Sequence, residues 1–207
     1  MISLLDYGAG NLTSVRKALQ YLGARFHTPA APGELAECSA LIVPGVGNFE
    51  ATAALTNDWI SAIARAVDGG SPLLGICLGL QWLFEGSGEA PCLKGFGAMA
   101  GTCALIQNDG YEGFGTFKVP HVGWNSLHLI RTSWLLEGVH EGDQVYFTHS
   151  YAAPVTADCV ASTTYGVEFA SIVENDHVAG VQFHPEKSGT VGLRILSNFL
   201  NRANTGA

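Results

Sequence analysis

Three short apolar runs alternate with three helix-like segments in the first 84 residues, and this order strongly restricts the possible folds. The apolar runs are continuous, as in strands that are buried on both faces of a sheet. In the segments between them, apolar residues recur at helical spacing. Such a β-α-β-α order predicts a mostly parallel sheet with helices on both faces. We expect strands at residues 2–6, 40–43 and 72–76, and helices at residues 12–22, 59–67 and 78–84.

The second half of the chain predicts short strands separated by turns, and residues 191–200 predict a closing helix. Residues 85–97 are rich in glycine and polar residues, so we expect a loop there. We find no repeat or linker, and therefore expect one α/β domain over residues 1–207, with an open, mostly parallel sheet and added antiparallel strands. These further strands are expected at residues 102–106, 126–130, 144–152, 159–164, 167–174 and 178–184.

The heptapeptide at residues 74–80, Leu-Gly-Ile-Cys-Leu-Gly-Leu, predicts a sharp strand-to-helix turn with Cys77 at its centre. Glycines on either side of the cysteine let the turn close and the helix approach the strand. A thiol at a helix N-terminus is favoured as thiolate, which is the reactive form of cysteine. Cys77 is therefore a candidate nucleophile. The alternative is a small buried apolar residue, which is what most free cysteines are.

A cysteine nucleophile needs a base, and the base needs an orienting group; His184-Pro185-Glu186 contains both. Proline disposes the preceding residue to an extended conformation, in which residues two apart face the same way. We therefore expect the Glu186 carboxylate to accept one ring N–H of His184, which leaves the other nitrogen for Cys77. The alternative is a surface loop whose His and Glu face solvent.

Acyl chemistry at Cys77 also needs N–H donors for an oxyanion. The backbone N–H of Leu78 is one candidate. The loop at residues 44–49, Pro-Gly-Val-Gly-Asn-Phe, offers others at Val46 and Gly47, because its glycines let the backbone approach a ligand. The alternative for this loop is an ordinary turn.

Two polar side chains could complete a pocket beside the sulfur. Gln81 lies one helical turn after Cys77. A carboxylate at Glu89, in the following loop, could hold a substrate ammonium, although loop glutamates are usually solvated.

Composition excludes several classes of protein. A net charge of −8 with only ten Lys and Arg and no basic block disfavours nucleic-acid partners. Neither a signal peptide nor a run of the roughly 18 apolar residues that span a bilayer is present, so we expect a cytoplasmic protein without membrane association.

Five cysteines without C-x-x-C spacing argue against structural zinc or a disulfide framework. Residues 8–10 lack the third glycine of a dinucleotide site, and cysteine triad chemistry needs no cofactor. Charged residues are only 14% of the chain, so either the core is unusually large or a partner covers part of the surface.

Residues 75–81, together with His184-Pro185-Glu186, resemble the class I (triad) glutamine amidotransferases. Three further segments resemble one branch of that family, the glutaminase subunits of imidazole glycerol phosphate synthase in histidine biosynthesis. These segments are residues 44–49 (PGVGNF), 120–125 (PHVGWN) and 184–188 (HPEKS). The resemblance implies a flavodoxin-like α/β fold.

The resemblance also implies roles for the site. Cys77 attacks the side-chain amide of glutamine, forms a glutamyl thioester and releases ammonia. His184 protonates the leaving ammonia and then activates water, and Glu186 orients His184. Further positions match those that bind glutamine in the family: Gln81, Glu89, and backbone groups around His149, Ser150 and Tyr151.

A resemblance to this branch further implies a heterodimer in which ammonia passes to a (β/α)8-barrel synthase (cyclase) subunit. Backbone donors at residues 45–47 would be gated by a peptide flip until the partner is engaged. Asn11, Trp124, Asn125 and Lys187 fall in segments that face the partner in the family, although a lone tryptophan is by default a core residue.

Two alternatives remain at this level. One is the glutaminase subunit of another amidotransferase, or a free γ-glutamyl hydrolase of the same fold. The other is a catalytically silent subunit that only binds a barrel partner.

Overall fold

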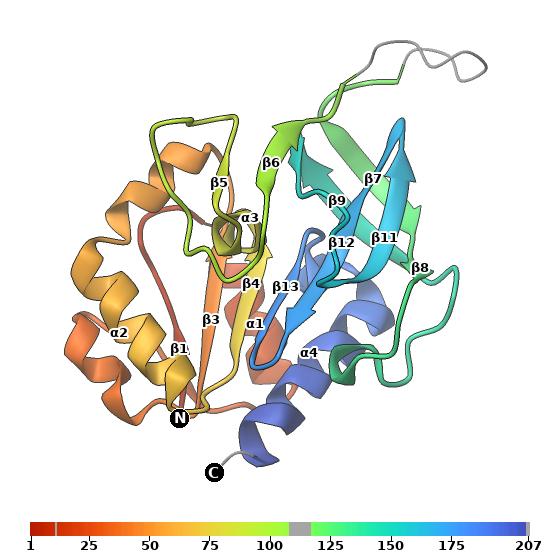
Figure 1. Cartoon of the computed structure of the whole chain (residues 1–207). Helices are drawn as coiled ribbons and strands as arrows, with labels where there is room; N and C mark the ends of the chain where they lie inside the picture. The colour runs from red at the N-terminus through yellow and green to blue at the C-terminus, as the bar shows by residue number, and fades with distance from the viewer. Residues whose placement is uncertain (11, 108–116, 206–207) are drawn as a thin grey trace.

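The computed structural model describes residues 1–10, 12–107 and 117–205, which form a central sheet with helices on both faces (Figure 1). In spatial order its strands are β2 (Phe26–His27), β1 (Ile2–Leu4), β3 (Ala40–Gly45), β4 (Leu73–Cys77), β13 (Val178–Val181), β12 (Val167–Asn175), β11 (Cys159–Tyr165) and β8 (His128–Leu129). Neighbours from β2 to β13 are parallel, and those from β13 to β8 are antiparallel. The predicted mixed α/β architecture is therefore confirmed.

Helices cover the two faces of the parallel half. Helices α1 (Leu12–Tyr21) and α4 (Gly189–Thr205) pack on one face, and α2 (Asn57–Asp68) and α3 (Leu78–Leu83) pack on the other. Alternate side chains of β3 divide between the two cores, because successive strand residues point to opposite faces. Ile42 joins the core under α1 and α4, whereas Leu41 and Val43 join the core under α2 and α3.

Two small sheets lie above the carboxyl ends of the central strands (Figure 1). One contains β10 (Tyr151–Ala152), β6 (Thr102–Leu105) and β5 (Gly86–Ser87), and the other pairs β7 (His121–Ser126) with β9 (Gln144–His149). The loop expected at residues 85–97 therefore contains the short strand β5.

Three strand predictions in this half are wrong in their bounds. The run at 144–152 breaks at Ser150 into β9 and β10, which join different sheets. The strand expected at 126–130 divides between two strands: Ser126 is the last residue of β7, and residues 128–129 form β8 in the central sheet. Leu127 lies between them and donates its N–H to Asp143 O. The strand expected at 178–184 ends at Val181.

Four short 3-10 segments, the strands β2 and β5 and most of β7 were not predicted. The 3-10 segments are η1 (Pro32–Glu37), η2 (Phe49–Ala54), η3 (Trp134–Leu136) and η4 (Pro185–Lys187). Segments this short carry too few residues for a periodic pattern. One of them, η4, begins directly after His184 and shapes the site described next.

Candidate active site

Cys77 is the hinge between β4 and α3, as the heptapeptide predicts. It is the last residue of β4, and α3 begins at Leu78. Its backbone has φ 55° and ψ −105°, a conformation that side chains other than glycine rarely adopt. Strain of this kind persists only where the surrounding structure enforces it, and it is commonly found at functional sites. The thiol is 5% exposed, so the nucleophile candidate is buried at the base of a pocket rather than prominent.

The two glycines that flank Cys77 allow α3 to approach the sheet more closely than any side chain would permit. A Cβ on Gly79 would overlap the carbonyl oxygen of Val43 in β3. A Cβ on Gly75 would lie 2.5 Å from the carbonyl oxygen of Gly79. The turn at Cys77 is therefore fixed by direct backbone contact between helix and strands.

His184 and Glu186 form a buried pair. The ring Nδ1–H of His184 donates to Glu186 Oε1 at 2.8 Å, and both side chains are less than 5% exposed. The pairing was predicted, but the predicted local geometry was wrong. His184 is extended (φ −98°, ψ 98°), whereas Glu186 lies in the 3-10 turn η4 that Pro185 starts. That turn, not a continuing strand, brings the carboxylate back to the ring.

His184 is also electrostatically linked to Cys77. Burial by itself lowers the pKa of His184, but the interactions with Cys77 and then with Glu186 outweigh burial and raise that pKa to about 10. The ring therefore holds its proton at neutral pH. Its Nε2 atom is buried and has no hydrogen-bond partner among the residues that the structure describes. This arrangement leaves one ring nitrogen for the sulfur or for a reacting group.

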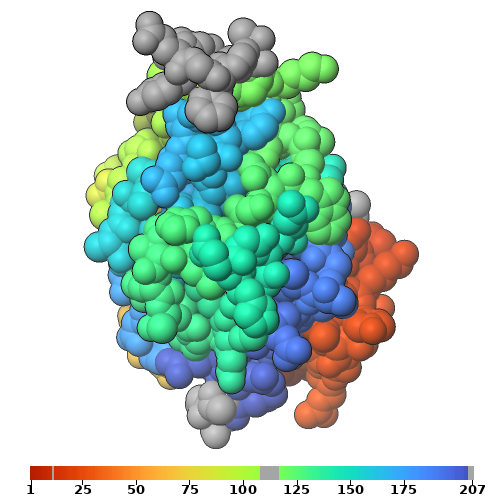
Figure 2. Space-filling model, turned by 90° about the vertical axis from the view of Figure 1, so that its right-hand side faces the viewer, coloured from red at the N-terminus to blue at the C-terminus, as the bar shows by residue number. Residues whose placement is uncertain are grey.

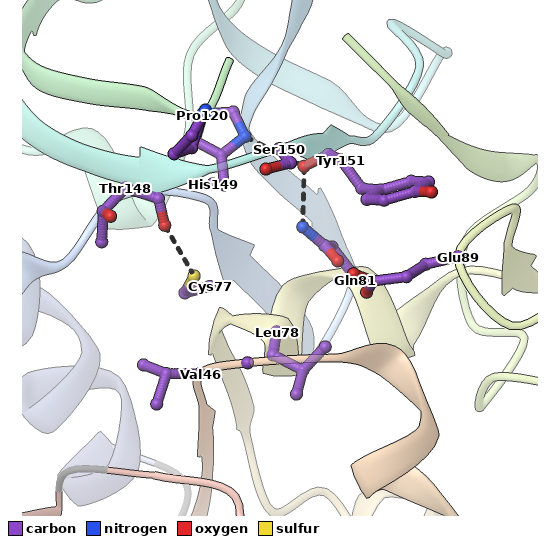
Figure 3. A pocket seen from close by; sticks show the side chains of 11 residues that line it. Val46, Cys77, Leu78, Gln81, Glu89, Pro120, Thr148, His149, Ser150 and Tyr151 are labelled. Atoms are coloured by element: carbon purple, nitrogen blue, oxygen red, sulfur yellow. Dashed lines mark hydrogen bonds between the residues drawn. The ribbon is translucent and has the colours of Figure 1, made fainter.

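A cavity of about 320 Å³ opens over Cys77 (Figure 3). The thiol of Cys77 donates to the carbonyl oxygen of Thr148 at 3.9 Å across this cavity. The lining combines the ends of β3 and β4, the start of α3 and the β9–β10 junction, with these residues: Val46, Gly47, Cys77, Leu78, Gln81, Glu89, Pro120, Thr148, His149, Ser150 and Tyr151. All five residues expected to bind glutamine thus line one cavity with Cys77.

Gln81 and Glu89 are held by backbone partners. The Nε2 amide of Gln81 donates to Tyr151 O at 2.8 Å (Figure 3), and the carboxylate of Glu89 accepts the N–H of Phe49 at 2.8 Å. These contacts fix both side chains along the cavity wall. An amide and a carboxylate in this position suit a ligand with an ammonium and an amide.

The donors expected from residues 44–49 are not all free. The N–H of Val46 donates to Ala9 O at 2.9 Å. Gly47 has φ +94° and lines the cavity. Donation from Val46 to a ligand therefore requires rotation of its peptide, whereas Leu78 begins α3 directly beside the sulfur.

Two buried histidines contact each other at the cavity wall: His149 lines the cavity, and His121 packs against His149. His149 Nδ1–H donates to Tyr151 O at 2.9 Å, so His149 Nε2 accepts from His121 Nδ1–H at 3.1 Å. The His121 ring stacks on Tyr165 and Phe147. Burial lowers the pKa of His121 to about 4 and that of His149 to about 3. Both rings are therefore neutral at pH 7, with fixed tautomers.

Because His121 and His149 have lowered pKa values in the folded protein, we expect the protein to lose stability in acid. Between about pH 6.5 and pH 4 the unfolded chain binds protons that the folded chain does not. The free energy of unfolding should therefore fall as pH falls, by up to about 1.4 kcal/mol per pH unit for each such proton. We expect His121→Phe to reduce the slope of the unfolding free energy against pH by up to the amount that corresponds to one proton. Urea unfolding at several pH values measures this slope.

His140→Gln is the control for this experiment, because the His140 side chain is 81% exposed. It should leave the slope of the wild type unchanged. An unchanged slope in His121→Phe would show that His121 takes up its proton equally in both states.

Three of the four expected partner-facing residues lie on the surface. Trp124 is 54% exposed, so the default of a core tryptophan is wrong. Its ring meets Tyr146 edge-on, and the Lys187 ammonium lies 6.0 Å from the centroid of the Tyr146 ring. Asn125 Nδ2 donates to Thr164 O. Asn11 lies outside the described residues.

In the space-filling view of the molecule, residues from about 119 to 140, in green and teal, cover much of one face beside α4 in blue (Figure 2). Exposed apolar side chains on this segment and its neighbours include Val119, Val122, Trp124 and Ile130. Exposed apolar groups are typical of surfaces that bind another protein.

Sequence reasoning missed Gln182 and Thr148. Gln182 is fully buried, and its Nε2 amide donates to Cys77 Sγ at 3.8 Å. The available signal was a single amide inside the apolar run Val178–Phe183. Within the described residues, no group of three His, Cys, Asp or Glu side chains is arranged to hold a metal ion. No helix in that part of the chain has the length and apolarity to cross a membrane.

Comparisons with known proteins agree with this geometry. The family described as glutamine amidotransferase class-I matches residues 3–203. A protein named imidazole glycerol phosphate synthase subunit HisH, from Geobacillus kaustophilus (strain HTA426), is 46% identical over 98% of this chain and 97% of the relative. The protein of the same name from Methanocaldococcus jannaschii is 40% identical over 97% of this chain and 98% of the relative.

Solved structures show the same fold at lower identity. A glutamine amidotransferase crystal structure has a TM-score of 0.73 at 21% identity, covering 98% of each chain. The glutaminase domain of Trypanosoma brucei CTPS with bound acivicin has a TM-score of 0.65 at 18% identity, covering 99% of this chain and 93% of that one.

Proposed function

The chain belongs to the class-I glutamine amidotransferase family, and from this membership we propose that it is the glutaminase subunit of imidazole glycerol phosphate synthase in histidine biosynthesis. Near-full-length relatives at 40–46% identity, all named as that subunit, support the assignment. The substrate is glutamine, and the products are glutamate and ammonia.

In the proposed reaction, Cys77 Sγ attacks the side-chain carbonyl carbon of glutamine. The imidazolium of His184 gives its proton to the departing nitrogen, so that ammonia leaves and a glutamyl thioester remains. Neutral His184 then takes a proton from water as the water attacks the thioester, and glutamate leaves while the thiolate is restored. Glu186 keeps the His184 ring oriented through the 2.8 Å hydrogen bond.

We assign recognition of the substrate to the cavity wall. Gln81, Glu89 and the backbone at residues 149–151 line the cavity around the sulfur. The carboxylate of Glu89 suits the ammonium of glutamine, and the backbone at the β9–β10 junction offers N–H and C=O groups. The Leu78 N–H is the first oxyanion donor, and the peptide at Val46 or Gly47 supplies the second.

The observation that carries this proposal is the strained Cys77 turn beside the buried His184–Glu186 pair. We expect a diazoketone analogue of glutamine to alkylate Cys77 stoichiometrically in the complex with the barrel subunit. Excess glutamine should prevent the reaction, and peptide mass spectrometry locates the label.

The matched control is Cys92→Ser, which removes an exposed free thiol that a reagent reaches more easily than the buried Cys77. In this variant Cys77 should be labelled as in the wild type. Labelling confined to Cys92, or labelling indifferent to glutamine, would reject Cys77 as the glutaminase nucleophile. It would also favour the alternative of a silent binding subunit.

We further propose that ammonia passes to a (β/α)8-barrel synthase subunit and that this partner controls the glutaminase. The face that carries Trp124 and Lys187 is the proposed contact surface. In the isolated chain the N–H of Val46 is bonded to Ala9, and rotation of that peptide would supply the missing oxyanion donor. Loss of one such donor costs about 10²–10³ in rate.

The isolated subunit should therefore hydrolyse glutamine about 10²–10³ times more slowly than the complex with the barrel subunit and its ligand bound. Steady-state glutamate production measures both rates. Equal rates would reject the gate and favour a free γ-glutamyl hydrolase. Reduced thiols are typical of the cytoplasm, where we propose that the enzyme acts, and all five cysteines are free.

A further inference from the structure

Gln182 contacts both Gln81, in the cavity wall that we assign to substrate binding, and Cys77, the proposed nucleophile. Its Oε1 accepts a hydrogen bond from Gln81 Nε2 at 3.2 Å, and its own Nε2 donates to Cys77 Sγ at 3.8 Å. The side chain is fully buried, so water does not compete for either contact. Unlike the residues of the cavity wall, it reaches the sulfur from the position directly after β13, the strand that pairs with β4.

The direction of these hydrogen bonds follows from the surroundings of Gln81. Gln81 Nε2 lies within reach of two oxygens, Tyr151 O and Gln182 Oε1, so this atom is the amide nitrogen with both hydrogens engaged. Gln182 therefore presents its oxygen to Gln81 and its NH2 group to Cys77. Tyr151 O is itself held by His149, so the whole chain of contacts is anchored.

His184 and Tyr7 are titratable groups that interact with Cys77. Among the uncharged groups around the sulfur, each protonation state of Cys77 has its own partner. The neutral thiol donates to Thr148 O, whereas a thiolate has no hydrogen to give and is repelled by that carbonyl oxygen. Gln182 supplies an N–H on the other side, and a hydrogen bond to an ionised acceptor is stronger than one to a neutral acceptor. The amide therefore favours the anionic sulfur over the neutral one.

We propose that Gln182 is a positioning residue of the glutaminase, which holds the Cys77 sulfur as a thiolate and aligns it with the Gln81 wall of the cavity. The inference rests on the proposed function for its biological meaning. Its test does not, because thiol alkylation needs no glutamine.

The test compares Gln182→Met with Gln81→Met in the full chain. Methionine is close in size to glutamine but has no N–H donor. Gln182→Met should slow the alkylation of Cys77 by iodoacetamide at pH 7 about tenfold, the order of one hydrogen bond to a charged group, and displace the pH–rate profile to higher pH. Gln81→Met leaves the Gln182 N–H in place, so it should raise KM for glutamine without a comparable loss of alkylation rate.

Two references separate this effect from a loss of structure. The exposed Cys92 is alkylated in the same sample, and its rate should be the same in every variant. Ser171→Ala removes a neighbouring buried hydroxyl that bonds Thr163, and it should alkylate at Cys77 as the wild type does.

A wild-type measurement covers the case in which Gln182→Met does not fold. With 15N-labelled glutamine, the side-chain NH2 resonance of Gln182 should shift when Cys77 is alkylated and when pH is varied through the thiol titration. A pH–rate profile in Gln182→Met that superposes on the wild type, or a resonance that does not respond, would overturn the proposal. Either result leaves the glutaminase assignment to be judged by its own labelling experiment.

Discussion

Replacement of Cys77 by alanine should abolish glutamine-dependent synthesis by the complex while ammonia-dependent synthesis continues at the wild-type rate. Loss of the nucleophile removes the covalent path, for which we expect glutamine hydrolysis to fall by at least about 10⁴. Ammonia supplied from solution bypasses this step, because under the proposed function the barrel subunit consumes ammonia whatever its source. Product formation with saturating glutamine, and separately with an ammonium salt at high pH, measures the two activities.

Alanine suits this experiment because it leaves no clash and only a small void in the turn. Cys92→Ser is again the control and should retain both activities. If glutamine still supports synthesis in Cys77→Ala, another group is the nucleophile and the role proposed for His184 fails with it. Loss of both activities would instead indicate a failure to assemble with the partner, which gel filtration detects.

The second large effect is expected from a single methyl group. Gly79→Ala should destabilise the chain by more than about 4 kcal/mol or prevent folding, which is beyond the range of most point substitutions. The added Cβ would overlap Val43 O, and α3 cannot retreat without breaking the backbone contact at Gly75. Urea unfolding followed by circular dichroism measures the loss, and the soluble yield reports the extreme case.

Gly33→Ala is the matched control. Gly33 lies in η1 and does not occupy the left-handed region, and a methyl group on its Cα would meet no heavy atom within 4 Å. The substitution should be neutral or slightly stabilising, because alanine restricts the unfolded chain. If Gly79→Ala unfolded at the same urea concentration as Gly33→Ala, the close packing of α3 on β3 would not be what fixes the turn at Cys77.

Local patterns were sufficient to predict three strands of the parallel half of the fold and the helices between them. β1, β3 and β4 are buried on both faces, and the helices between them keep one apolar stripe, so each element has a strong pattern of its own. β7 was missed because its exposed face carries apolar side chains at Val122 and Trp124, which removes the alternation expected of a half-buried strand. Its bounds depend on pairing with β9, which lies distant in sequence.

The residues of the candidate site also divide into those that a local sequence motif predicts and those that it does not. Cys77 and the pair His184 and Glu186 were predictable, because each carries a local motif. Gln182 was not, because its contact with the sulfur depends on the register of β13 against β4, in which Val181 pairs with Ile76. Nothing within either strand reveals which neighbour an inward-facing amide will meet.

The adjacency of β4 and β13 has a consequence for the order in which activity arises during synthesis of the chain. The ribosome completes the nucleophilic turn roughly a hundred residues before His184, the proposed base, which follows β13. Strand pairs that are distant in sequence form late, because loop closure costs entropy. A nascent chain therefore holds a thiol without an acid–base partner. We therefore expect a copy that ends before residue 184 to lack glutaminase activity.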